Sequence, residues 1–497
     1  MAPDMTAPVL VAAKPRAELL LRPFVAVPAI LFVVAMVFLP SLNDWFMYHD
    51  YIHLGAAATH SVGDYAKRVL DPGDGGESLF TTGRLYRPTY YLTMLVEERA
   101  FGLSNPFPYH LVNFSMHLLN VFLVFLIARK LTRDTLVSYV AALVYGLHPI
   151  FYEAPIWISA ITEVLLATFS FLAIYLFIRH LEERGLLAGV LYGATLVSAV
   201  LALGAREPGV SIFLILPAYY FLVHAPHEWR QPRAWLRFAP FFAVLGVYAI
   251  MRYSITTDVA SGEGGNAVGS VGWHMFTNVF LFNQWAVVPI YSNLGAWFPA
   301  VTGFAAILLM RVHEEFFFRG GGVGRFLVFW WYVVVFTYST AGWIKPLIAG
   351  RYLYMALGAF AILCGLAVPW LADLARRWFP AVGSWAKVVA YAAVPLVIAP
   401  ALIWGTLHHE DSFAWGAGES HKFVDQLRDS YDSLPAGSML YVVNTPKVLL
   451  FADGPFFLTP AVRWYYPGVT AKNISPEEAP GIHASMGEND HILVYRP

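Results

Sequence analysis

Cysteine and charge are both scarce in this sequence. One cysteine, Cys364, among 497 residues excludes a disulfide within the chain. Only 13% of the residues are charged, the net charge is -1, and no basic tract points to a nucleic-acid partner. Hydrophobic residues instead make up 58% of the chain, more than a soluble protein of this length can bury. We therefore expect a polytopic membrane protein.

Long apolar runs predict about eleven transmembrane helices. An aromatic segment, 274–289, is interrupted by Asn278, Asn283 and Gln284, and we expect it to lie in the membrane interface. No small-residue cleavage site follows the first run, so this run is predicted to be an uncleaved span. The predicted spans are approximately 24–39, 111–128, 136–147, 161–178, 186–205, 210–223, 238–251, 296–310, 326–343, 351–370 and 388–404.

The distribution of lysine and arginine predicts the orientation. These residues are more frequent in the loops that would lie inside, which places the tail 1–22 in the cytoplasm and the first outer loop, 41–109, outside. The expected fold class is an all-α membrane domain over 23–405 in the plasma (inner) membrane. Residues 406–497 are predicted to form a small soluble α/β domain on the extracytoplasmic side. Its expected elements are a helix at 420–434 and strands at 439–443 and 492–495.

The first candidate for chemistry is Asp50, which follows the first span closely and stands beside His49. A carboxylate near the membrane surface can act as the base that deprotonates an acceptor hydroxyl. Asp50 could equally be the N-cap of a helix that begins at Tyr51. We expect His49 to flank or orient the carboxylate.

Other ionisable residues lie at the predicted outer ends of spans. Such groups often mark substrate paths, although snorkelling of long side chains explains them as well. We interpret Arg87, Arg206 and Arg351 as candidates for binding a donor phosphate, with Tyr354 about one turn deeper than Arg351. The candidates for the substrate pocket are Arg84, His148, Glu153, Glu207 and Lys345.

Each of these candidates has an alternative structural interpretation. Arg206 and Glu207 are adjacent in sequence and could neutralise each other. His148 and Glu153 could cap the turn after the third span. One histidine and one glutamate do not make a metal site, so no metal or other cofactor is assigned.

Four motifs together resemble the membrane part of the tetratricopeptide-repeat O-mannosyltransferases and their bacterial relatives, which are class C glycosyltransferases. They occur in the expected order over roughly residues 45–360. The motifs are Tyr86-Arg87-Pro88 through Asn105-Pro106, Tyr109-His110, Asn113 and His117; His148-Pro149 with Glu153 and Trp157-Ile158-Ser159; Arg206-Glu207-Pro208-Gly209; and Arg351-Tyr352-Leu353-Tyr354.

The resemblance implies a fold, a donor and a base. It implies a polyprenyl-phosphate sugar as donor, an inverting transfer on the outer face of the membrane, and a base in the first outer loop that maps to Asp50. The acceptor would be a protein, a lipid or a glycan. The tetratricopeptide repeats have no counterpart here, since residues 406–497 take their place, so the acceptor is not carried over.

One departure from the family pattern supports a different function. Relatives often have an acidic pair in the first loop, and here its first member is His49. The alternative prediction is therefore a non-catalytic scaffold subunit that keeps this fold within a larger membrane complex. The two hypotheses differ in whether the outer cavity binds a lipid phosphate.

Overall fold

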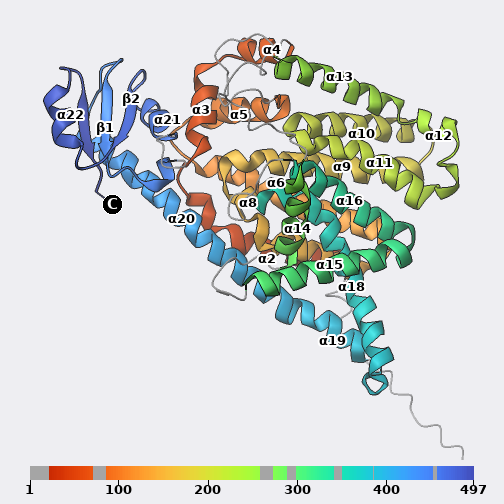
Figure 1. Cartoon of the computed structure of the whole chain (residues 1–497). Coiled ribbons are helices and arrows are strands. Elements are labelled where there is room, and N and C mark those ends of the chain that lie inside the picture. Colours follow the sequence, from red (N-terminus) through yellow and green to blue (C-terminus); the bar gives the residue numbers. More distant parts are fainter. Residues whose placement is uncertain are drawn as a thin grey trace, which may run out of the picture.

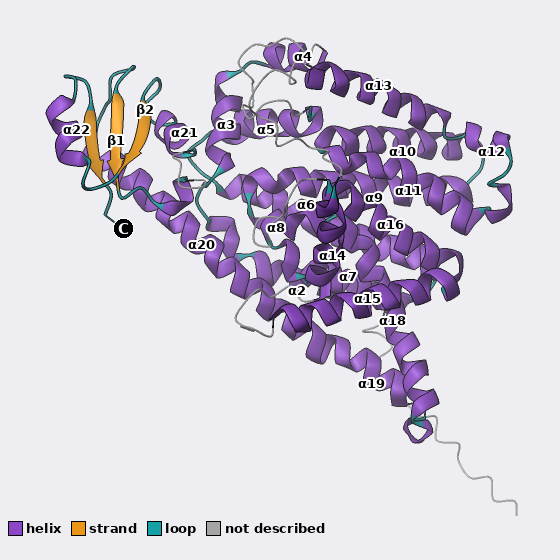
Figure 2. Cartoon of the chain, viewed as in Figure 1, coloured by secondary structure: helices purple, strands orange, loops and turns teal. Residues whose placement is uncertain are grey.

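The computed structural model describes residues 22–70, 86–257, 272–287, 298–340, 350–383, 385–450 and 456–496. Helices form the body of the molecule, and a small sheet stands at one side of it (Figures 1 and 2). The long helix α20 (Ala399–Ser430) runs from the helical body to the sheet (Figure 1). Two predicted site residues, Arg84 and Lys345, lie outside the described residues.

The helical body is built from long helices and shorter connecting ones. The long helices are α2 (Pro23–Phe38), α6 (Phe107–Thr132), α7 (Thr135–Leu147), α9 (Ile161–Glu182), α10 (Gly185–Ala205), α13 (Ala239–Thr257), α14 (Trp273–Val287), α15 (Phe298–Arg319), α16 (Gly321–Ser339) and α18 (Ala356–Trp378). The short helices α11 (Ile212–Tyr219) and α19 (Trp385–Ala393) also belong to this body. The shorter ones that matter for the site are α3 (His49–Thr59), α4 (Val62–Leu70), α5 (Pro88–Phe101), η2 (Pro149–Phe151), α8 (Glu153–Ile156), η3 (Ile158–Ala160), η4 (Glu207–Ser211) and η8 (Gly350–Leu353).

Seven helical segments of the described chain are long and apolar enough to cross a membrane. Three shorter apolar helices, Pro23–Phe38, Thr135–Phe151 and Ala239–Met251, overlap further predicted spans. Apolar helices satisfy their own backbone hydrogen bonds, as a lipid environment requires. The expectation of an integral, mainly helical membrane protein is thereby confirmed, and the number of about eleven crossings stays a prediction. The seven segments are Phe107–Thr132, Ile158–Glu182, Gly185–Ala205, Glu207–His224, Gly321–Ser339, Ala356–Trp378 and Trp385–Ser430.

A tight turn makes α6 and α7 antiparallel neighbours. Arg133 ends α6 in the left-handed conformation, with φ 55°. Asp134 then caps α7, because its Oδ1 accepts hydrogen bonds from the backbone N–H groups of Leu136 (2.8 Å) and Val137 (3.2 Å). Short connections of this kind place successive helices side by side.

The polar residues of α14 point into the protein. Asn278 Nδ2 donates to the backbone oxygen of Ser339 (2.9 Å), and Asn283 Oδ1 accepts from Trp331 Nε1 (3.2 Å). Both partners belong to α16, so these amides fix α14 against α16. The interfacial location predicted for this segment is not addressed by these contacts and stays a prediction.

The C-terminal domain contains the predicted strands and a third one. Strands β1 (Met439–Val443), β2 (Thr470–Ile474) and β3 (His491–Val494) form a parallel sheet in the order β2-β1-β3. Two short helices, α21 (Leu458–Arg463) and α22 (Ala479–Ser485), complete the domain.

The link between this domain and the helical body is a helix, not a loop. The helix expected at 420–434 is the last part of α20, which runs without a break through the boundary predicted at residue 405. The domain also touches α3, since Trp464 Nε1 donates to the backbone oxygen of Tyr51 (2.7 Å). The Tyr51 hydroxyl in turn lies 2.7 Å from Ser420 Oγ of α20.

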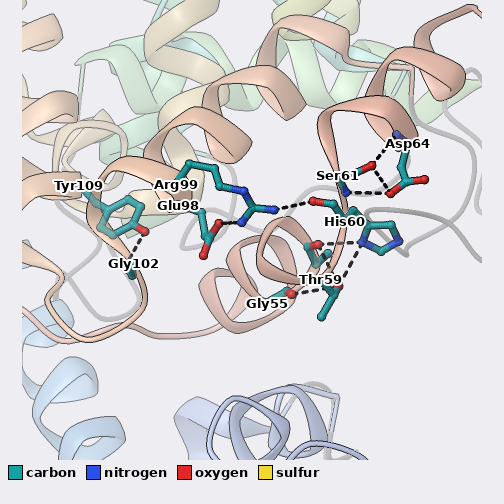
Figure 3. Close-up of polar contacts among 10 residues, drawn as sticks. Gly55, Thr59, His60, Ser61, Asp64, Glu98, Arg99, Gly102 and Tyr109 are labelled. Atoms are coloured by element: carbon teal, nitrogen blue, oxygen red, sulfur yellow. Dashed lines mark hydrogen bonds and ion pairs between the residues drawn. The ribbon is translucent and has the colours of Figure 1, made fainter.

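Polar contacts hold the helices α3, α4 and α5 together (Figure 3). Arg99 of α5 donates through Nη2 to the backbone oxygen of His60 at the end of α3 (2.7 Å). Ser61 and Asp64 cap the start of α4 reciprocally, with distances of 2.7 Å and 3.1 Å between side chain and backbone N–H. The end of α3 opposite Asp50 is therefore fixed to α5.

Gly350, directly before Arg351, is a position where a side chain has no room. A Cβ at Gly350 would lie 2.1 Å from the backbone oxygen of Ile150 in η2. We expect Gly350→Ala to push η8 away from η2 and to lower the free energy of unfolding by about 1–3 kcal/mol, as overpacking does. Thermal unfolding of the purified protein measures this. Gly189→Ala in α10, where a Cβ meets open space, is the control and should not destabilise; equal melting temperatures for the two variants would contradict the prediction.

Candidate functional site

A cavity of about 160 Å³ lies among α3, α5, η3, η8, the start of α9 and the end of α10. Its walls combine basic, aromatic and small polar side chains contributed by segments far apart in the sequence. The lining residues are His49, His53, Arg87, Tyr90, Tyr91, Trp157, Ser159, Ala160, Thr162, Arg206 and Arg351.

The backbone is strained at Tyr48, directly before α3 and two residues before the candidate base Asp50. Tyr48 has φ 51° and ψ -123°, a conformation that non-glycine residues rarely adopt. The chain turns there, so that Asp50 falls in the first turn of α3, whose first residue is His49. Asp50 is therefore not the N-cap of a helix that begins at Tyr51.

The carboxylate of Asp50 is buried and hydrogen-bonded. Its Oδ1 accepts from the backbone N–H (2.9 Å) and from the hydroxyl (2.5 Å) of Ser159, and its Oδ2 accepts from the backbone N–H of Met47 (3.0 Å). Only 1% of Asp50 is exposed, and it is absent from the residues that line the cavity. Ser159, which donates to this carboxylate, does line the cavity.

Burial shifts the pKa values of both residues of the His49-Asp50 pair. Desolvation raises the pKa of Asp50 to about 6, although the hydrogen bonds from Ser159 and Met47 act in the opposite direction. Desolvation lowers the pKa of His49 to about 4, and the positive charges of Arg351 and Arg87 lower it further. Near neutral pH, Asp50 is thus mostly ionised and His49 is neutral.

Three arginines line the cavity, and each is paired with a glutamate from another segment. Arg87 contacts both carboxylate oxygens of Glu207, with the shortest distance 2.7 Å. Arg206 Nη1 lies 2.6 Å from Glu163 and donates to Thr162 Oγ1 (3.1 Å). The three Arg–Glu pairs are Arg87–Glu207, Arg206–Glu163 and Arg351–Glu153, the last with a distance of 2.5 Å.

Aromatic rings hold two of the guanidinium groups in place. The guanidinium carbon of Arg351 lies 4.9 Å from the ring centre of Trp157, and that of Arg206 lies 4.8 Å from the ring centre of Tyr352. Cation–π contacts of this kind stabilise a buried arginine while its planar group stays able to bind an anion. The hydroxyl of Tyr338 also donates to Glu163 (2.5 Å), which fixes the carboxylate that pairs with Arg206.

Of the predicted site residues, His49, Arg87, Arg206 and Arg351 line the cavity. Asp50, Glu153 and Glu207 do not line it but contact residues that do, whereas Tyr354 and His148 have their contacts elsewhere. Tyr354 is fully buried, and its hydroxyl contacts His117 Nδ1 (2.8 Å) and Asn120 Nδ2 (3.2 Å). His148 is also buried; its Nδ1 accepts from the backbone N–H of Ile150 (3.3 Å) and its Nε2 contacts the backbone oxygen of Ala286 (3.0 Å). Tyr354 therefore does not line the cavity with the three arginines, and His148 caps η2, as the structural interpretation of this residue predicted.

Arg206 and Glu207, whose adjacency suggested a pair, each form an ion pair with another segment. Arg206 has an extended backbone, with φ -162° and ψ 152°, at the end of α10, and Glu207 begins η4. Successive side chains on extended backbone point in opposite directions. Glu207 consequently reaches Arg87, and Arg206 reaches Glu163.

Four residues of the site, Ser159, Thr162, His53 and Glu163, are not among the site residues predicted from the sequence. Ser159 was quoted only as part of a motif, and Thr162 and His53 gave no signal by themselves. Glu163 did have a signal, because it is a carboxylate inside a predicted span, where ionisable groups are costly and usually functional. Within the described ranges, no group of three or more His, Cys, Asp or Glu side chains is arranged to hold a metal ion.

Part of the chain is similar in sequence to known mannosyltransferases. A family model described as dolichyl-phosphate-mannose-protein mannosyltransferase matches residues 99–251. The Protein O-mannosyl-transferase TMTC2 of Mus musculus and that of Homo sapiens are each 30% identical over 143 residues, which is 28% of this chain. The match covers 17% of the length of these relatives.

The fold is also found in a solved structure. The crystal structure of ArnT from Cupriavidus metallidurans bound to undecaprenyl phosphate matches with a TM-score of 0.52 and 14% sequence identity, over 93% of this chain and 95% of that chain. The resemblance drawn from the motifs is therefore confirmed: the chain has the fold of the class C membrane glycosyltransferases and is similar in sequence to the O-mannosyltransferases.

Proposed function

We propose that this protein is a membrane glycosyltransferase that moves a sugar from a polyprenyl-phosphate donor to an acceptor on the extracytoplasmic face, with inversion at the sugar carbon. The acceptor is a protein, a lipid or a glycan. In this proposal the N-terminus is cytoplasmic and the sheet domain is extracytoplasmic.

The observation that carries the proposal is the convergence of Arg87, Arg206 and Arg351 on one cavity beside Asp50. A guanidinium has five N–H donors, more than the contacts that its glutamate partner makes with it. The remaining donors suit the oxygens of a phosphate, which arginine binds in a planar, bidentate manner. The name of the matching family and the undecaprenyl phosphate bound to ArnT support the choice of a lipid phosphate.

The reaction we propose is a single displacement. The bond between the sugar C1 and the phosphate oxygen breaks, and its electron pair leaves with the lipid phosphate. The acceptor oxygen forms the new bond to C1, and its proton passes to Asp50. The transition state carries oxocarbenium character, and the arginines stabilise the charge that develops on the departing phosphate.

The experiment uses the full chain in membrane vesicles with undecaprenyl-phosphate mannose, labelled in the sugar, as the donor. We expect the label to move to membrane-associated protein, lipid or glycan, and undecaprenyl phosphate to be released in equal amount. Vesicles that carry the double variant Asp50→Asn/Arg351→Lys are the control and should release none. Donor that stays intact with the wild-type protein, together with no measurable binding of undecaprenyl phosphate, would count against the proposal.

A further inference from the structure

The position of Ser159 between Asp50 and the cavity raises the question of how a proton reaches the carboxylate. The Asp50 carboxylate is 1% exposed and lies behind the cavity wall. Ser159 contacts both sides, since it lines the cavity and its hydroxyl donates to Asp50 Oδ1 over 2.5 Å. An acceptor hydroxyl in the cavity would therefore meet Ser159 before Asp50.

The segment that carries Ser159 is held rigidly. Asn113 of α6 donates through Nδ2 to the backbone oxygens of Trp157 (2.8 Å) and Ile158 (3.3 Å). The backbone N–H of Ser159 makes a second bond to Asp50 Oδ1 (2.9 Å), so both the main chain and the hydroxyl of Ser159 are aligned with the carboxylate. Such fixed geometry is what efficient proton transfer requires.

We propose that Ser159 is a catalytic proton relay between the acceptor and Asp50. The Ser159 oxygen receives the proton of the acceptor hydroxyl while the proton of Ser159 moves to Asp50 Oδ1. The acceptor oxygen, now nucleophilic, attacks the sugar C1, and the electron pair of the broken bond leaves with the lipid phosphate. Ser159 ends the step as a neutral hydroxyl, and Asp50 ends it protonated and later loses the proton to water. This relay rests on the function proposed above.

A pH profile can test the relay because few neighbours of Asp50 titrate in the same range. Burial lowers the pKa of His49 to about 4 and that of His53 well below its usual value, whereas burial raises the pKa of Glu97, further along α5, to about 8. Burial raises the pKa of Asp44, six residues before Asp50, to about 6 as well, so the profile includes Asp44→Asn, which should keep the acidic limb that belongs to Asp50. The titratable or charged side chains on α3 and on the elements packed against α3 include His49, Tyr51, His53, Arg87, Tyr90, Tyr91, Glu97, Glu98, Arg99 and Arg463.

The test compares the transfer rate of Ser159→Ala with that of the wild-type protein from pH 5 to pH 9, in the vesicle assay with undecaprenyl-phosphate mannose. Loss of the hydroxyl removes a hydrogen bond that favours the ionised carboxylate of Asp50, so the pKa of Asp50 should rise. The fall of the rate on the acidic side of the profile should then occur at a pH about one unit higher. The relay predicts in addition that the plateau rate at high pH falls about 100-fold or more. A residue that only tunes the pKa of Asp50 would change the limb and leave the plateau at its wild-type level, and that result would overturn the relay.

Two further variants keep the test decisive. Ser159→Thr keeps a hydroxyl and should retain most of the plateau rate, whereas Ser159→Gly, which lacks one, should lose it like Ser159→Ala. An equal loss in the threonine variant would overturn the relay even if Ser159→Ala failed to fold. Binding of undecaprenyl phosphate should be the same in all three variants. Asp50→Asn in the same assay tests the proposed function separately. If this variant kept its activity, Asp50 would not be the base.

Discussion

Asp50→Asn is expected to lower sugar transfer about 100- to 10,000-fold, the range associated with loss of a general base. The amide has nearly the shape of the carboxylate and can still accept the two hydrogen bonds from Ser159 through its oxygen. It places an NH₂ group opposite the N–H of Met47, where Oδ2 now accepts, so we also expect a loss of about 1–3 kcal/mol in the free energy of unfolding. The measurements are initial transfer rates and thermal unfolding.

The matched control for this prediction is Asp64→Asn. Asp64 also accepts hydrogen bonds near the start of a short helix, from the backbone N–H and the hydroxyl of Ser61, but it is exposed, and its partner Ser61 does not line the cavity as Ser159 does. Its substitution should leave transfer at the wild-type rate. In the wild-type protein, activity should fall as the pH drops through about 6, because the raised pKa of Asp50 leaves its carboxyl protonated below that value. Near-normal transfer by Asp50→Asn would exclude this carboxylate as the base.

Arg351→Lys is expected to lower transfer about 100- to 1000-fold, the cost of removing one well-placed donor to a developing negative charge. Lysine keeps a positive charge beside Glu153, so the buried glutamate is not left unpaired. It lacks the planar group that lies 4.9 Å from the Trp157 ring centre and the donors that match a phosphate. Transfer rates and the affinity for undecaprenyl phosphate measure the effect.

Removing the charge altogether should damage the fold as well. Arg351→Ala leaves Glu153 buried without a cation, and breaking a buried ion pair in this way costs about 3–5 kcal/mol. The control for Arg351→Lys is Arg179→Lys. Arg179 pairs with Glu183 (2.8 Å) at the partly exposed end of α9 and does not line the cavity. The control variant should leave both transfer and stability unchanged. Equal donor affinity in Arg351→Lys and the wild-type protein would contradict the assignment of Arg351 to the phosphate.

The helices could be predicted from the sequence because lipid imposes a simple rule on the chain. A segment without water must satisfy its backbone hydrogen bonds internally, so an apolar run of sufficient length becomes a helix. The run at 161–178, for example, is α9 (Ile161–Glu182). The rule does not say where a helix stops once it leaves the membrane. The predicted domain boundary at 405 therefore falls inside α20, which continues to Ser430.

Which side chains form ion pairs within the site depends on the direction of the backbone, and the sequence alone does not reveal that direction. The sequence identified Arg206 and Glu207 but could not show that extended backbone turns their side chains apart. It placed Ser159 in the motif Trp157-Ile158-Ser159 but gave this residue no role, since a serine beside an apolar run is ordinary. Glu163 could have been found from its position within a span, and its pairing with Arg206 explains why this carboxylate is tolerated there.

The uninterrupted course of α20 has a mechanical consequence. A helix is stiff along its axis, so α20 limits the motion of the sheet domain relative to the helical body more than a flexible linker would. The sheet domain has a second attachment, because Trp464 is hydrogen-bonded to the backbone oxygen of Tyr51, one residue after Asp50 in α3. A force on the sheet domain, such as the binding of another molecule to it, would therefore be transmitted to the first turn of α3.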